Sequence, residues 1–370
     1  MYPASTAAAG GKELLIMSMS GALGGLHEAC FGVPDLDQAA RYWSAFGFRA
    51  ATRGALDQHA AEALYGVPCA VRSLRLRHLD SDHGLVRLMQ WDRPLGAGVG
   101  AVGLRLHGGR WVAQFVRSTL EVANHADLAR RAGECVLEAS PSFVDLTSSN
   151  PALRGGRSAR AFVDPLLALR EFTLIQPLWR QALLERFGYD SAMLGRIDDT
   201  ALLRASQITN ASFMVRSDDT DIFTFYERTL GLQCSAVQEI TWDKAMASRE
   251  AFSLREGETH WCYTFDEPRS GQTADTRRSG RLYLFRFGCA SHMEDGLAES
   301  RPGHLGCTLF TWRVADAAEF RGVCASEGCT EITPLTTDEF GAIAFSCVTP
   351  DGMTWTFQQA TAAERESLSA

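Results

Sequence analysis

Lysine is nearly absent from this chain, and so are the features that would mark it for nucleic acid or a membrane. Only Lys12 and Lys244 are lysine among 36 basic residues, which we attribute to a GC-rich coding sequence. The formal net charge is −8 over 370 residues, and an acidic balance argues against nucleic acid because phosphate binding requires a basic face. No apolar run approaches a membrane span, and no basic segment precedes a signal-type run. We therefore expect a cytoplasmic protein, monomeric or homodimeric, whose partner is a small molecule.

Paired cysteines and phosphate-binding loops are also missing. The ten cysteines include no CxxC pair. This scatter favours buried free thiols, which behave as small hydrophobic side chains, over disulfides or zinc. The thiols in apolar, strand-like runs are Cys30, Cys262, Cys307 and Cys347. No nucleotide fingerprint and no Ser/His/Asp set stands out, so the sequence predicts no nucleotide cofactor.

What the chain does contain is a long-range internal repeat. Residues 32–48 resemble residues 213–232, and residues 162–177 resemble residues 347–359. The offset is 184 residues between Gly47 and Gly231, and 185 residues between Pro165 and Pro350. Two landmarks more than a hundred residues apart thus keep nearly the same spacing, which indicates a tandem duplication.

Apolar spacing predicts the order strand, helix, three strands twice within each half. The first pass has a strand at 26–33 and a helix at 36–46 that Gly47 ends. We therefore predict an α+β fold of four βαβββ modules in two tandem domains. The expected organisation is a flexible tail at 1–24, a first domain at 25–177, a helical connector at 178–207, a second domain at 208–360 and a tail at 361–370.

This pattern resembles the vicinal oxygen chelate superfamily, which includes glyoxalase I, extradiol dioxygenases and bleomycin-resistance proteins. The resemblance rests on two kinds of segment. VPDLDQAARYWSAFGF and DIFTFYERTLGL match the opening strand and helix, while FVDPLLALREF and VTPDGMTWTF match the closing turn and last strand. It covers residues 25–360 and implies that each domain curls into a half-barrel with metal ligands on its inner face.

The resemblance places Glu28 and Glu171 at ligand positions of the first domain, with a divalent metal possible there and His27 as a register alternative. The corresponding positions of the second domain carry Asn210 and Thr356, which are poor metal ligands. The middle positions do not fit the family pattern: they carry Arg87 or Gln90, and Arg117 or Trp111. The two-His-one-Glu set of an extradiol dioxygenase is therefore not visible.

If Glu28, Arg87 and Glu171 converge, they form a catalytic acid–base site. Of two carboxylates in one place, one has its pKa raised and moves a proton, while the arginine keeps the other ionised. The alternative is an ion-pair network that closes a vestigial half-barrel. In the second domain, Phe285 and Trp312 are expected to bind a planar substrate with Asn210 and Thr356 as hydrogen-bonding groups, the alternative being ordinary sheet core.

Two functions remain open at this point. One is a glyoxalase-like enzyme performing lyase or isomerase chemistry on a small oxygenated molecule, aromatic or keto-acid-like, in the first domain. The other is a non-catalytic protein that binds and sequesters a small, cationic aromatic compound, as the bleomycin-resistance relatives do. Glu171 at the family's ligand position favours the enzyme.

Overall fold

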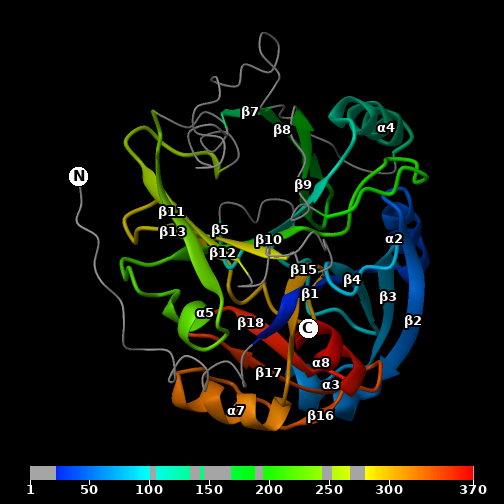
Figure 1. Cartoon of the computed structure of the whole chain (residues 1–370), viewed down its shortest axis with the longest axis vertical. Helices are drawn as coiled ribbons and strands as arrows, with labels where there is room; N and C mark the ends of the chain where they lie inside the picture. The colour runs from blue at the N-terminus through cyan, green and yellow to red at the C-terminus, as the bar shows by residue number, and fades with distance from the viewer. Residues whose placement is uncertain are drawn as a thin grey trace.

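Two eight-stranded sheets carry the fold of this chain (Figure 1). The computed structural model describes residues 22–100, 106–133, 142–145, 168–187, 195–243, 252–266 and 280–369. The first sheet has the order β16-β17-β18-β15-β1-β4-β3-β2, and the second has the order β11-β12-β13-β10-β6-β9-β8-β7. In Figure 1 the first sheet forms the lower part of the molecule and the second the upper part.

The strands of the first sheet come from both ends of the chain: β1 (Ala22–Gly32), β2 (Phe48–Leu56), β3 (Val71–His78), β4 (Leu85–Trp91), β15 (Gly306–Val314), β16 (Thr336–Thr337), β17 (Ile343–Val348) and β18 (Thr354–Gln359). The second sheet uses the middle: β6 (Arg110–Phe115), β7 (Ser142–Asp145), β8 (Ala168–Ile175), β9 (Arg180–Phe187), β10 (Asn210–Arg216), β11 (Gln233–Thr241), β12 (Thr259–Asp266) and β13 (Arg281–Phe287). A short pair joins β5 (Leu106–His107) to β14 (Glu294–Asp295).

Each sheet consists of two four-stranded groups with the same internal order, which confirms the predicted α+β fold of βαβββ modules and half-barrels. The groups that meet come from opposite halves of the chain. Strand β1 pairs antiparallel with β15, and β6 pairs antiparallel with β10. The first sheet therefore joins the group β1–β4 to the group β15–β18, and the second sheet joins the group β6–β9 to the group β10–β13. The domain boundaries at 177 and 208 stay predictions.

The helices are α2 (Leu36–Ser44), α3 (Gln58–Tyr65), α4 (Thr119–Arg131), α5 (Thr224–Arg228), α7 (Ala317–Ser326) and α8 (Ala362–Ser369). Helix α2 matches the helix predicted at 36–46. The Asp35 carboxylate caps it by accepting a 2.8 Å hydrogen bond from the Gln38 amide, and Gly47 follows its end with a left-handed φ of 89°. None of the described helices is both long and apolar enough to cross a membrane.

The helical connector expected at 178–207 is wrong for its first part, because residues 180–187 form strand β9. The reason is burial on both faces. Leu183 belongs to the large core between the sheets, whereas Ala182 and Leu184 pack against Ala113 and Phe115 on the other side. A strand covered on both faces lacks the alternation of polar and apolar residues that identifies a strand.

One apolar core is shared by the helix-bearing faces of both sheets. It contains Trp43 of α2, Phe213 of β10 and Trp355 of β18. Trp312 also lies in this core, fully buried, with its ring 6.1 Å from that of Trp355. The opposite faces are called here the inner faces. The inner face of the first sheet carries Glu28, and that of the second carries Glu171.

The predicted N-terminal tail lies mostly outside the described residues, and strand β1 begins at Ala22 within its expected span. The closing turn that the repeat places at 162–167 also lies outside the described residues.

Candidate functional site

Glu28 lies on the inner face of the first sheet and is held by two arginines. The Arg75 side chain donates to Glu28 Oε1 at 2.5 Å, and Arg87 Nη2 lies 2.6 Å from Glu28 Oε2. Thr311, which is opposite Glu28 in the β1–β15 register, donates to the same Oε2 at 3.0 Å. Glu28, Arg87 and Thr311 are fully buried. The carboxylate therefore has each of its oxygens occupied by a donor.

A loop from the other end of the chain completes this network. Arg87 Nη1 donates to Glu339 Oε2 at 3.0 Å, and Arg87 Nη2 donates to Asp338 Oδ2 at 3.2 Å. The hydroxyl of Tyr65, at the end of α3, accepts from Arg87 at 2.8 Å and donates to Glu339 at 2.8 Å. Arg75 and Arg87 both stack on the ring of Phe340, at 4.1 and 4.8 Å from its centroid.

This arrangement fixes the protonation state of Glu28. Burial alone would raise the pKa of the Glu28 carboxyl, but the charges of Arg75 and Arg87 outweigh burial and hold that pKa far below its ordinary range. A carboxylate that stays ionised and fully hydrogen-bonded cannot exchange protons with a substrate. The contacts of Glu28 therefore match the alternative stated above, an ion-pair network that closes a half-barrel.

The same geometry decides whether the first sheet can hold the divalent metal that the fold implies. The four inner-face positions are Glu28 on β1, Arg87 on β4, Thr311 on β15 and Thr356 on β18. The guanidinium of Arg87 already lies against Glu28, and Thr356 is hydrogen-bonded to Ser346 at 2.7 Å. One paired carboxylate with two hydroxyls and a fixed cation is a donor set that does not fit such a metal.

The residues at the alternative registers make contacts outside this network. The His27 imidazole contacts the backbone oxygen of Asp82 at 3.2 Å, and burial lowers the pKa of His27 well below its ordinary value. Gln90 donates to the Pro34 carbonyl at 2.7 Å, and Arg117 pairs with Asp199 at the surface.

Glu171 is not part of this network, because it lies on β8 of the second sheet. The expected convergence of Glu28, Arg87 and Glu171 thus holds only for the first two. Glu171 is half-buried, and burial raises the pKa of its carboxyl to about 7. Among the residues that the structure describes, no cation or hydrogen-bond donor is paired with it.

Strand register places Glu171 on the same face as Asn210, another predicted site residue. Glu171 is opposite Leu184 of β9, and Leu184 is opposite Phe115 of β6. Two residues along β6, Ala113 is opposite Asn210 of β10. Paired residues project to one side of a sheet and alternate residues share a side, so Glu171, Ala113 and Asn210 share the inner face.

Aromatic side chains cover the part of this face beyond Asn210. Met214 is opposite Phe285, whose ring lies 6.2 Å from that of Trp111 and 4.9 Å from that of Phe252. The imidazole of His260 stacks on Phe287 at 4.9 Å. Phe285, Asn210 and Glu171 therefore share the inner face of the second sheet. Trp312 instead belongs to the apolar core, and Thr356 belongs to the inner face of the first sheet.

His260 lies on β12 of the second sheet. In the structure both of its ring nitrogens are buried without a hydrogen-bond partner, and burial lowers its pKa to about 4. The residues that sequence reasoning missed altogether are Tyr65, Arg75, Asp338, Glu339 and Phe340. The one local signal that could have indicated this cluster is the acidic pair Asp338-Glu339, which directly precedes Phe340 and Gly341.

Comparison with known proteins gives a likeness of structure only. No family model matches the sequence, and no curated protein matches it. Glyoxalase I from Zea mays superposes with a TM-score of 0.51 at 14% identity, covering 93% of this chain and 95% of that chain. A point mutant of the same maize enzyme gives 0.52 at 15%, covering 96% and 99%. A putative dioxygenase from Bacillus subtilis gives 0.50 at 11%, covering 92% and 86%.

Identities this low show the fold and leave the chemistry open. The likeness of fold extends over nearly the whole length of this chain. The chain thus has a glyoxalase I-like fold.

Proposed function

We propose that this chain is a glyoxalase-like enzyme that performs lyase or isomerase chemistry on a small oxygenated molecule, aromatic or keto-acid-like, at the inner face of the second sheet. The observation that carries the proposal is Glu171, a half-buried carboxyl without a charged partner among the described residues and with a pKa of about 7. Buried carboxyls are seldom kept unpaired without a task.

A pKa near 7 suits Glu171 to proton transfer. Both the carboxylate and the carboxylic acid are populated near neutral pH, so one side chain can remove a proton and return it. Lyase and isomerase reactions beside a carbonyl need such a step, with the proton leaving one carbon and arriving at another atom. On the strands beside it Glu171 meets apolar side chains, because its register partner on β9 is Leu184, and Phe115 of β6 lies beyond Leu184.

Asn210 and Trp111 are the proposed binding residues. Three strand spacings separate β8 from β10, about 14 Å across the sheet. The Asn210 amide can donate to a substrate oxygen, and Trp111, whose ring lies 6.2 Å from that of the buried Phe285, can offer a ring face to an aromatic group. No step is assigned to a metal, because Glu171 and Asn210 alone offer too few ligand atoms for one.

Deuterium incorporation tests the proposal without knowledge of the natural substrate. Purified protein is incubated in D₂O with phenylpyruvate, an aromatic 2-keto acid, and loss of the C3 proton signal is followed by NMR. We expect wild type and Glu239→Gln, an exposed control on β11, to accelerate exchange equally. Glu171→Gln should slow it by about 10²-fold or more. Equal exchange in both variants would contradict a proton-transfer role for Glu171.

The second candidate is a non-catalytic protein that sequesters a small cationic aromatic compound. The specific observation in its favour is the aromatic cluster of Trp111, Phe252 and Phe285 on the same face of the sheet as the unpaired carboxyl of Glu171. Quenching of tryptophan fluorescence by proflavine, a planar aromatic cation, separates the two functions. Tight proflavine binding that strengthens above pH 7, together with no exchange of any 2-keto acid, would favour sequestration over the enzyme.

A further inference from the structure

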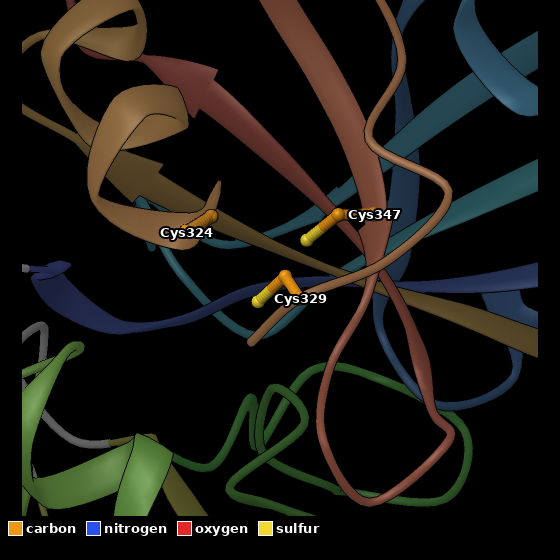
Figure 2. Close-up of side chains that lie close together, drawn as sticks. All are labelled: Cys324, Cys329 and Cys347. Carbon is orange, nitrogen blue, oxygen red and sulfur yellow. The ribbon is translucent and has the colours of Figure 1, made fainter. Parts of the chain in front are cut away.

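Three cysteine sulfurs meet in the apolar core on the helix-bearing side of the first sheet. They belong to Cys324 on α7, Cys329 after that helix and Cys347 on β17, and the three sulfurs lie within 4.8 Å of one another. Figure 2 shows the side chains of Cys329 and Cys347 extending toward the helix end that carries Cys324, from separate parts of the ribbon. All three thiols are free, and all three residues are buried.

The fold brings these residues together by specific contacts. Helix α7 is anchored to the sheet by Phe320, whose ring lies 4.9 Å from that of Phe357. Gly328 follows the helix with a left-handed φ of 82°, which turns the chain back so that the Cys329 amide donates to the Cys324 carbonyl at 3.1 Å. Thr330 then exchanges hydrogen bonds of 2.9 Å with Val348, which places Cys329 beside Cys347.

We propose that Cys324, Cys329 and Cys347 form a binding site for one soft metal ion, with Cu(I) as the best match. Thiolates select soft ions such as Cu(I). An ion about 2.3 Å from each of three sulfurs holds those sulfurs about 4 Å apart, which agrees with the observed cluster. Binding replaces the thiol protons, which pass to solvent, and needs no oxidant.

Coordination number favours Cu(I) over Zn(II). A structural zinc site takes four protein ligands, whereas the cluster contains three, with no His, Asp or Glu joining it among the described residues. Phe320, Phe345 and Phe357, which belong to the same apolar core, offer no further donor atom. Cys329 is the most exposed of the three at 8%, so an ion would enter from its side.

This cluster is separate from Glu171 and Asn210, which lie on the second sheet. The inference is accordingly independent of the proposed function.

The test is anaerobic titration of the full chain with Cu(I), supplied as its acetonitrile complex, against the chelator bathocuproine. We expect wild type to retain one equivalent of copper and to melt at a higher temperature when loaded, because the ion binds the folded state. Cys347→Ser and Cys324→Ala should each lower the retention at least 10-fold. Cys307→Ser, a buried cysteine in β15 outside the cluster, should leave retention unchanged.

X-ray absorption of the copper-loaded wild type gives a readout that does not depend on the stability of any variant. Three sulfur neighbours at about 2.3 Å would support the site. Copper bound by one or two sulfurs, equal copper in wild type and Cys347→Ser, or no retained copper would overturn it. Stoichiometric Zn(II) that Cu(I) cannot displace would overturn the assignment of the ion.

Discussion

Arg87 Nη2 lies 2.6 Å from Glu28 Oε2, and neither side chain is exposed to solvent. The two residues come from adjacent strands of the first sheet, and Asp338 and Glu339 approach the same guanidinium from a loop more than 250 positions later in the sequence. A fixed cation thus occupies the inner face of this half-barrel. Its removal would leave three buried carboxylates facing one another.

Replacing Arg87 by methionine should therefore lower the free energy of unfolding by about 3–5 kcal/mol, because the buried carboxylates lose their partner. Arg53→Met is the matched control, since Arg53 pairs with Asp37 in a solvent-exposed position where an ion pair contributes less than about 1 kcal/mol. Urea denaturation measures both changes. A loss for Arg87→Met as small as that for Arg53→Met would refute the structural role of the pair.

Gly54 allows the acidic loop to reach this network. A Cβ atom at Gly54 would lie 1.8 Å from the Glu339 carbonyl oxygen, a distance that no side chain can occupy. We expect Gly54→Ala to displace the loop and to destabilise the protein by about 1–3 kcal/mol, as overpacking generally does. Gly322→Ala on α7 meets nothing within 4 Å and should be neutral or stabilising by up to about 1 kcal/mol. Thermal unfolding distinguishes the two, and similar melting temperatures would count against the docking.

Glu171 predicts a pH dependence of stability with a definite sign. Its pKa in the folded protein is about 7, above the value of about 4.3 for an exposed glutamate. Between these values the folded protein binds more protons than the unfolded chain, so the free energy of unfolding contributed by Glu171 falls as pH rises from about 4.3 to 7. The difference between wild type and Glu171→Gln, measured by urea denaturation at several pH values, isolates this term. A difference that is constant across this range would contradict the raised pKa.

Asn210 and Thr356 were both predicted to bind substrate, and the structure separates them. Thr356 is fully buried and hydrogen-bonded to Ser346, whereas Asn210 lies on the inner face that carries Glu171. Asn210→Ala should weaken phenylpyruvate binding about 2- to 10-fold, the worth of one hydrogen bond. Thr356→Val should leave the dissociation constant unchanged. Isothermal titration calorimetry measures both, and a reversed order would move the site to the first sheet.

Local patterns were sufficient for some elements, failed for β9, and did not reveal how the elements assemble. Asp35, the helical spacing from Leu36 and Gly47 predicted helix α2 correctly, because capping and amphipathicity are encoded within a dozen residues. Glu28 and Arg87 were brought together correctly by analogy with the family. Glu171 was assigned to the final strand of its module because β9, buried on both faces, was mistaken for a helix.

Other parts of the site depend on contacts that no local pattern reveals. Asp338 and Glu339 reach Arg87 only because β1 pairs with β15, and sequence spacing carries no information about which strand groups share a sheet. The cysteine cluster was missed for the same reason: Cys329 and Cys347 become neighbours through the pairing of Thr330 with Val348, not through a short motif.

The pairing of β1 with β15 also determines when the nascent chain can complete the first sheet. Glu28 and its register partner Thr311 are 283 positions apart. At ribosomal rates of about 5–20 residues per second, this edge of β1 stays without its partner strand for roughly 14–57 s. During that interval an apolar strand has open hydrogen-bonding groups, which are a template for association with other chains. We therefore expect ribosome-bound intermediates of this chain to expose that edge of β1 until β15 has been synthesised.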